Sequence, residues 1–149
     1  MELKKEITVG ALLGRTSHNM SLLLDKVFHK NDVDLNVEQF VLLKILSFND
    51  GLNQKKLSEL IDRDKTTIAR LITKMEKKNM LLRVNSREDK RVNNVYITNY
   101  GKEILHEVLP FIREVDDVLI SSVTREELQV FTRVMYKLCD KIKLMEEKL

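Results

Sequence analysis

The sequence predicts a mainly α-helical fold of the α+β class, a winged helix-turn-helix with long helices at both ends of the chain. Two short amphipathic helices separated by a tight turn are indicated over residues 53–79. Two runs of alternating apolar and polar residues, separated by a charged loop, follow over residues 82–97. The composition agrees, because 43% hydrophobic and 33% charged residues with only 4 Gly and 1 Pro are typical of a helix-rich globular protein.

The first third of the chain predicts two helices. Residues 6–29 carry an apolar stripe at helical spacing: Val9, Leu13, Met20, Leu24 and Val27. His18 and His29 fall on the polar side of this helix. Asn36 is a predicted N-cap for the next helix, with Gln39 at the position that a capping box requires. That second helix is apolar on most sides, so we expect it to be central and buried.

The next two helices form a helix-turn-helix pair. Asn53 is the predicted N-cap of the first, whose inner face is expected to carry Leu57, Leu60 and Ile61. A short turn then leads directly into the second helix. This spacing allows one helix to brace another in the major groove of DNA.

The second helix of the pair covers about residues 64–79 and has two contrasting faces. One face is apolar and should be buried: Ile68, Leu71, Ile72 and Met75. The opposite face has hydroxyls and cations without an acid: Thr66, Arg70, Thr73 and Lys77. Asp64 is the predicted N-cap, and free N–H groups in the first turn attract phosphate. The alternative is an ordinary amphipathic helix with a solvated basic face.

Residues 82–97 predict a two-stranded wing. Two pairs of apolar residues alternate with polar ones: Leu82 and Val84, then Val95 and Ile97. The loop between them carries Arg87, Lys90 and Arg91, and an arginine on a thin wing can enter the minor groove. Asp89 is expected to pair with a nearby arginine and to fix the loop. The alternative is a solvated surface hairpin.

Two further helices complete the chain. Thr98 is the predicted cap of the first, and Gly101 in its first turn suggests the close approach of another element. Pro110 lies inside this helix and should kink it. Thr124 and Glu127 form the capping box that opens the last helix.

The last helix carries an apolar seam with heptad spacing, which consists of Leu128, Phe131, Met135, Leu138, Ile142 and Met145, with Leu149 continuing it. The seam could pack on this chain's own first and fifth helices, or it could form a dimer interface built by both termini. We favour the dimer, because terminal helices with a continuous seam usually need a partner. Cys139 lies beside the seam, and we expect a buried structural thiol there.

Charge is distributed unevenly along the chain. The net charge is only +3, but residues 51–102 contain 8 Lys and 5 Arg against 3 Asp and 3 Glu, a local charge of +7. A basic middle between acidic flanks is the electrostatic signature of a nucleic-acid-binding lobe.

Several function classes are disfavoured by the same composition. One cysteine excludes an intrachain disulfide and suits a reducing cytosol, so we expect a cytoplasmic protein. No apolar run approaches a membrane span, and no membrane partner is expected. His18, His29 and His106 lack metal-ligand spacing, and no Gly-rich phosphate loop is present. We therefore expect neither an enzyme nor a cofactor or metal site.

A longer stretch resembles the core of the MarR family of bacterial transcriptional regulators: LSELIDRDKTTIARLITKMEKKNMLLRVNSREDKRVNNVYITNYGKEI, residues 57–104. The most specific features are the D-x-R at Asp89 and Arg91 and the Ile97-Thr98 followed by Gly101. Where the family commonly has Gly after the recognition helix, this chain has Asn79, the next best residue in the left-handed conformation. Less specific likeness covers the whole chain.

The resemblance implies a homodimer whose terminal helices form the interface, and a ligand cleft between those helices and the DNA-binding lobe. It implies that Lys65, Thr66, Thr67 and Arg70 face the major groove, while Arg91 enters the minor groove and Asp89 braces the wing. The full set of expected DNA-binding residues, from the resemblance and the helix and wing patterns together, is Lys65, Thr66, Thr67, Arg70, Thr73, Lys74, Arg87, Lys90 and Arg91. The oxidant-sensing cysteine that some members have near the N-terminus is missing.

The sequence thus predicts a DNA-binding transcriptional regulator, a repressor relieved by a small-molecule effector. It should act as a homodimer on double-stranded DNA with pseudopalindromic half-sites. Residues 1–34 and 100–149 are expected to dimerise and residues 35–99 to bind DNA, within one compact chain rather than as independent domains. The alternative function is a winged-helix protein–protein interaction module that does not bind DNA.

Overall fold

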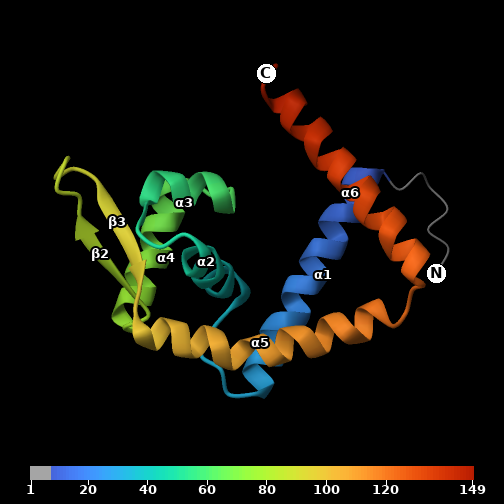
Figure 1. The fold of residues 1–149 in the computed structure, drawn as a ribbon, viewed down its shortest axis with the longest axis horizontal. Helices are drawn as coiled ribbons and strands as arrows, with labels where there is room; N and C mark the ends of the chain where they lie inside the picture. Colours follow the sequence, from blue (N-terminus) through green and yellow to red (C-terminus); the bar gives the residue numbers. More distant parts are fainter. Residues whose placement is uncertain (1–7) are drawn as a thin grey trace. The chain divides into compact units, whose positions relative to one another are not determined.

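The computed structural model describes residues 8–149, which form two compact units. One unit extends to Phe111 and contains all the strands, and the other comprises Ile112–Leu149 (Figure 1). Both units belong to the predicted mainly helical fold with a small sheet, which is confirmed. None of the helices in residues 8–149 is long and apolar enough to cross a membrane.

The elements follow the predicted order with one addition. They are α1 (Val9–Lys30), α2 (Val37–Phe48), β1 (Leu52–Asn53), α3 (Gln54–Ile61), α4 (Lys65–Lys77), β2 (Leu81–Asn85), β3 (Asn93–Ile97), α5 (Asn99–Ile120) and α6 (Arg125–Glu146). Thr8 caps α1, which begins at Val9. The predicted start of this helix at residue 6 lies outside the described residues. The helix α5 continues through Pro110 without a break.

The sheet has three antiparallel strands in the order β1-β3-β2, not the two predicted from sequence. The added strand β1 is only two residues long, with Leu52 opposite Val95 and Asn53 opposite Asn94. A strand of this length has no period that a sequence pattern could reveal. It matters for the site, because it fixes the start of α3 beside the wing, which we define as β2, β3 and the loop between them.

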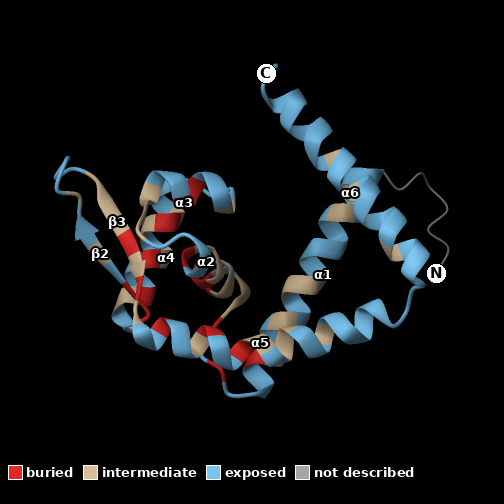
Figure 2. Cartoon of the chain, viewed as in Figure 1, coloured by how far each residue is buried: buried red, intermediate tan, exposed pale blue. Residues whose placement is uncertain are grey.

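The core of the first unit lies between α2, α4, the sheet and the first half of α5 (Figure 2). The predicted inner face of α4 is confirmed at Ile68, Ile72 and Met75, which are fully buried, and Leu71 is half-buried. Other core side chains come from α1, α2, α3 and β3: Phe28, Leu42, Leu43, Leu46, Leu57 and Val95. The expectation that α2 is central is therefore confirmed.

Helix α3 corrects one prediction. Leu57 is buried as expected, but Leu60 is 48% exposed. Ser58 is buried in its place, and its hydroxyl donates to the carbonyl of Lys55 at 2.8 Å. A small hydroxyl that bonds its own helix can face the core at little cost, so α3 turns its Leu57 and Ser58 side inward.

Strand β2 shows which side of the predicted alternation faces the core. Leu82 and Val84 are 41% and 46% exposed, whereas Leu81 is buried. Arg83 therefore lies on the inner side of the strand with a half-buried side chain. The alternation of β2 predicted a strand correctly, but the inward position in its middle is occupied by an arginine.

The predicted helix ends are confirmed by their hydrogen bonds. Asn36 with Gln39 and Thr124 with Glu127 form complete capping boxes. Asn79 adopts the left-handed conformation with φ of 58°. At the start of α5 the hydroxyl of Thr98 accepts the N–H of Gly101 at 3.0 Å.

Candidate nucleic-acid interface

The recognition surface is built on the first turn of α4. Asp64 caps this helix through two bonds from Thr67, whose N–H donates at 2.9 Å and whose hydroxyl donates at 2.6 Å. The Thr67 hydroxyl and N–H hold the pKa of the Asp64 carboxyl below its ordinary value of 3.8. The predicted contact residue Thr67 thus uses its hydroxyl proton within the cap, while Lys65 and Thr66 remain exposed beside it.

The outer face of α4 is basic and hollowed. A shallow depression of about 360 Å³ runs along it, and none of the residues that line it is acidic: Thr66, Ala69, Arg70, Thr73, Lys74 and Lys77. Four of the nine predicted DNA-contacting residues therefore lie together on one surface of this helix. Their side chains are exposed, because the opposite face of the helix is buried in the core.

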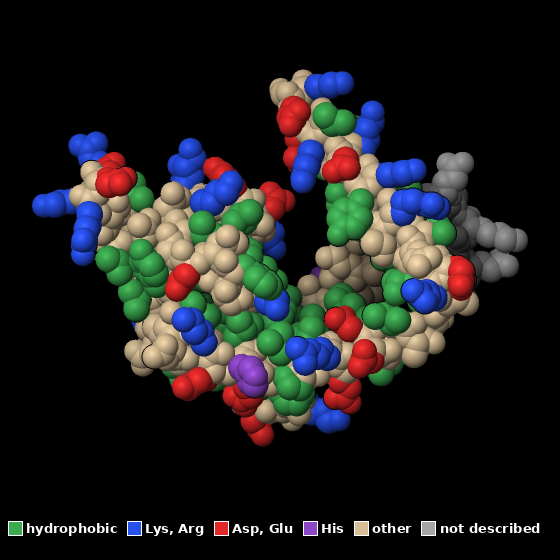
Figure 3. Space-filling view, in the orientation of Figure 1, with side chains coloured by type: hydrophobic (Ala, Val, Ile, Leu, Met, Phe, Trp, Pro, Cys, Tyr) green, Lys and Arg blue, Asp and Glu red, His purple; other side chains and the backbone are tan. Residues whose placement is uncertain are grey.

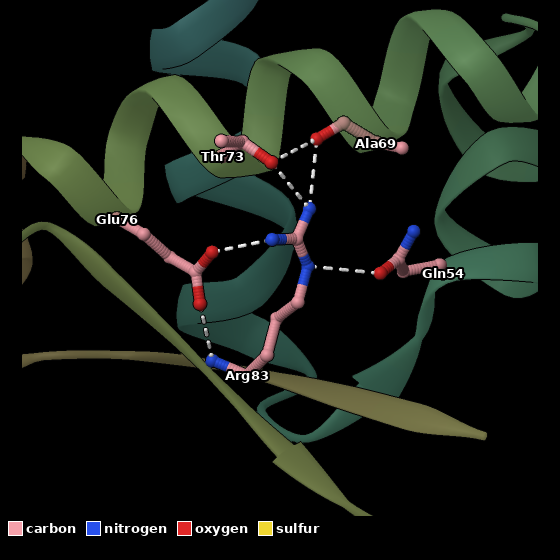
Figure 4. A network of polar contacts seen from close by, with 5 residues as sticks. All are labelled: Gln54, Ala69, Thr73, Glu76 and Arg83. Carbon is pink, nitrogen blue, oxygen red and sulfur yellow. Dashed lines mark hydrogen bonds and ion pairs between the residues drawn. The ribbon is translucent and has the colours of Figure 1, made fainter. Parts of the chain in front are cut away.

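Arg83 fixes this helix to the sheet and to α3 (Figure 4). Its guanidinium donates to Gln54 Oε1 at 2.9 Å, to the Ala69 carbonyl at 2.7 Å and to Thr73 Oγ1 at 2.9 Å. It also forms an ion pair with Glu76, whose other carboxylate oxygen accepts the Arg83 N–H at 2.9 Å. One side chain thereby links β2 to α3 and to two turns of α4.

The loop of the wing is fixed by Asp89, although not in the predicted way. The Asp89 carboxylate accepts the backbone N–H of Arg91 at 2.9 Å, and its carbonyl accepts the N–H of Val92 at 2.9 Å. No ion pair joins it to an arginine within residues 8–149. The guanidinium of Arg91 thus stays free of Asp89, because the carboxylate stabilises the turn through the backbone.

Exposed cations lie on the wing and on α3. Figure 3 shows Lys and Arg side chains at the tip of the wing and over α3. Arg87, Lys90 and Arg91 are all exposed in the loop of the wing. Of these, Arg91 lines a hollow together with Lys65 of α4, so the structure brings these two predicted residues to one place.

Sequence reasoning missed two residues of this surface. Arg83 was not among the predicted site residues, because its partners Gln54, Ala69 and Glu76 come from other elements. Lys55 lines the same hollow as Lys65 and Arg91. In the sequence it is one of two adjacent lysines at the start of α3, and nothing local distinguishes it from Lys56. The third strand, β1, and the bond from Arg83 to Gln54 bring this part of the chain to the wing.

The predicted dimerisation residues lie on α6, in the second unit. No residue of this helix is buried. Leu128, Met135 and Leu138 are half-buried, whereas the rest of the seam is exposed: Phe131 by 59%, Ile142 by 50% and Met145 by 57%. Cys139 is exposed, so the prediction of a buried thiol is wrong for the isolated chain. Cys139 shares this exposure with its helix, in which no residue is buried.

The histidines do not form a site. His18, His29 and His106 are each exposed on the surface of a helix, as predicted. Among residues 8–149, no three His, Cys, Asp or Glu side chains are grouped so that they could hold a metal ion.

Together, the helix pair, the wing and the basic surface across them define a winged helix-turn-helix protein. Residues 35–92, which cover α2 to the loop of the wing, match the model of the MarR family. The matched region overlaps residues 57–104, whose sequence resembles the same family.

Comparisons with individual proteins agree. The transcriptional regulator HosA of Escherichia coli O157:H7 is 27% identical over 105 residues, which cover 70% of this chain and 78% of HosA. The crystal structure of MarR has the same fold, with a TM-score of 0.85, 21% identity and 100% of both chains covered. The structure of the MepR–DNA complex of S. aureus superposes with a TM-score of 0.81 and 24% identity, covering 92% of this chain and 99% of MepR.

Proposed function

We propose that the protein is a sequence-specific DNA-binding transcriptional regulator. The observation that carries this proposal is the acid-free basic face of α4, supported from behind by a buried face and flanked by a wing with three exposed cations. A helix of this kind fits the major groove, and cations on a thin wing suit the narrower minor groove beside it. The similarity to HosA and to MepR, which was solved with DNA, supports the same function.

The individual contacts follow from where the side chains lie. We assign the major-groove face to Lys65, Thr66, Arg70, Thr73 and Lys74, and we assign Thr67 to the cap and to the edge of that face. Arg70, in the middle of the exposed face, is the best-placed side chain for a bidentate contact to guanine. Arg87, Lys90 and Arg91 of the wing provide phosphate and minor-groove contacts.

Fluorescence anisotropy on the DNA upstream of the protein's own gene tests this function, with a scrambled duplex as the control and two salt concentrations. We expect tighter binding to the native duplex, because base contacts add to the electrostatic term. Equal and steeply salt-dependent binding to both duplexes would reduce the protein to a non-specific binder of this DNA. No binding at low salt would contradict the proposed function and favour a protein–protein interaction module.

We further propose that the functional form is a homodimer in the cytoplasm. The support is the apolar seam of α6, which stays half-buried or exposed in the single chain. Exposed apolar surface of this extent typically marks an interface. A two-fold dimer would require pseudopalindromic DNA, with half-sites about one helical turn, or roughly 10 bp, apart.

We also propose repression relieved by a small ligand, on the basis of the family resemblance. Such a ligand can lower DNA affinity only by the difference in its own affinity for the DNA-competent and incompetent states. Compounds that raise the melting temperature of the free protein would be added to the protein–DNA complex. The proposal requires that one of them releases the DNA. If every stabilising compound left the DNA affinity unchanged, ligand-relieved repression would be wrong.

A further inference from the structure

A basic notch lies where α3, α4 and the wing meet. It is a half-open hollow of about 290 Å³, lined by Asn53, Gln54, Lys55, Lys65, Arg91, Val92 and Asn93. Three of these residues are cations, each from a different element, and none is an acid. Within residues 8–149, none of the three cations forms an ion pair. The notch therefore concentrates uncompensated positive charge at one point.

The walls of the notch are held in place by strand pairing and by side-chain hydrogen bonds. Asn53 pairs with Asn94 across β1 and β3, which fixes the start of α3 beside the wing. Gln54 is held by its 2.9 Å bond from the guanidinium of Arg83. On the opposite wall, the Asp89 carboxylate accepts the N–H of Arg91 at 2.9 Å and fixes the turn that presents this residue. Little ordering of the backbone would be needed for an anion to bind there.

The position of the notch relates it to the shape of DNA. The major groove of B-DNA is about 12 Å wide and the minor groove about 6 Å, and a sugar–phosphate strand separates the two. A protein that places α4 in the major groove and its wing in the adjacent minor groove must pass over that strand. The notch lies between the first residue of α4 and the end of β3 that adjoins the loop of the wing. It would therefore face the phosphates of the strand.

We propose that this basic notch binds a phosphate of the DNA strand that separates the two grooves, with Lys55 as an additional contact outside the recognition helix and the wing. The inference rests on the proposed DNA binding and adds a specific ligand group and a residue to it. The contact is independent of base sequence, because phosphate carries no sequence information. It would set the register of the lobe on the duplex rather than select the site.

The neighbouring lysine provides a matched control. Lys55 and Lys56 are both exposed in the first turn of α3, but Lys56 pairs with Glu59 at 3.4 Å and does not line the notch. Lys55→Gln and Lys56→Gln remove the same charge from the same helix. In salt titrations of DNA binding, K55Q should lower the steepness of log K against log salt by about 0.9, the value of one phosphate contact. Wild type should then lose about 3.5-fold more affinity than K55Q when salt is raised fourfold.

K56Q should keep the slope of the wild type. The loss in K55Q should be equal on native and scrambled duplexes, and its melting temperature should match that of K56Q. If both variants changed the slope equally, or neither did, the notch would not be a phosphate site, even though the wild type binds DNA. A wild type that binds no duplex would instead remove the proposed function itself.

Neutralising single phosphates gives a second measurement. Duplexes that carry one methylphosphonate each, placed in turn along the half-site, should reveal a position where the wild type loses affinity. K55Q should bind the duplex modified at that position as tightly as it binds the unmodified duplex, because its contact to that phosphate is already gone. An additive loss at every position would contradict the assignment of Lys55 to a phosphate.

Discussion

Arg83 is the residue on which the interface depends most at the scale of single side chains. Its guanidinium reaches Gln54, Ala69, Thr73 and Glu76, and it is only 21% exposed. Arg83 and Glu76 are both half-buried, and each charge stabilises the fold only while the other is present. Removing either one would leave a half-buried charge without its partner, which is costly. The arginine at the inward-facing position of β2 therefore holds the recognition helix against the sheet.

The first prediction concerns this arginine. Arg83→Ala should lower the free energy of unfolding by about 2 kcal/mol, because it leaves one oxygen of the Glu76 carboxylate and the Gln54 carbonyl without their donor. Arg83→Lys should lower the free energy of unfolding by less, since lysine keeps the positive charge but lacks the several N–H donors of the guanidinium. Urea denaturation measures both. Arg87→Ala, in the exposed loop of the wing, should stay within about 0.5 kcal/mol of the wild type. Equal stability of R83A and R87A would refute the role of Arg83.

Asp64 leads to a prediction about pH. Because Thr67 lowers the pKa of the folded carboxyl below 3.8, the resulting stabilisation is fully present above that pH and is lost as the pH falls through the lowered pKa. Wild type should therefore melt at a higher temperature than Asp64→Asn at pH 7. The difference should shrink only as the pH falls below 3.8 and through the lowered pKa, and it should approach zero where both side chains are neutral caps. A melting-temperature difference that grew on acidification would reverse the expected sign.

At the scale of whole elements, the start of α5 is defined by a close approach. A Cβ placed on Gly101 would lie 2.3 Å from the carbonyl oxygen of Met80. That carbonyl also accepts the N–H and the hydroxyl of Thr98. The chain leaving the recognition helix is thus held directly against the helix that leaves the wing, and only glycine allows this distance.

The third prediction compares two glycines. Gly101→Ala should destabilise the protein by about 2 to 3 kcal/mol, because the clash is with backbone that cannot rotate away. Gly14→Ala, inside α1, meets nothing within 4 Å in the described chain and should stabilise it by about 0.5 to 1 kcal/mol. Opposite shifts in the midpoint of urea denaturation are expected. A neutral effect of G101A would show that α5 and the end of α4 can separate freely.

At the scale of the whole molecule, α6 poses the question of assembly. A helix of 22 residues without one buried side chain gains little stability from tertiary packing in the single chain. A partner that covers the seam would remove its apolar surface from water. Exposure of the seam is thus the strongest indication of the proposed dimer.

The fourth prediction tests that assembly. Phe131→Glu places a charge on the seam, and Gln129→Glu adds the same charge at an exposed position two residues earlier. Sedimentation equilibrium should give the wild type and Q129E twice the chain mass of 17.5 kDa, whereas F131E should approach the single mass. A wild type that sediments at 17.5 kDa, or an F131E variant that remains dimeric, would show that α6 does not form the interface.

The sequence by itself determined the order of the helices, their capping residues and the two faces of α4. These features depend on hydrogen bonds between near neighbours and on a helical period of 3.6 residues, so a short stretch contains all the information they need. Asn36, Asp64 and Thr124 each cap a helix as their local patterns predicted.

Only the tertiary structure decided the rest. The inward position of Arg83 depends on Gln54 and Ala69, which lie 29 and 14 residues away. The exposure of Leu60 depends on which side of α3 meets α2 and α4. Lys55 reaches the basic notch because a two-residue strand pairs with the wing. Long-range pairing leaves no local period in the sequence, since its energy comes from contacts that exist only once the chain has closed.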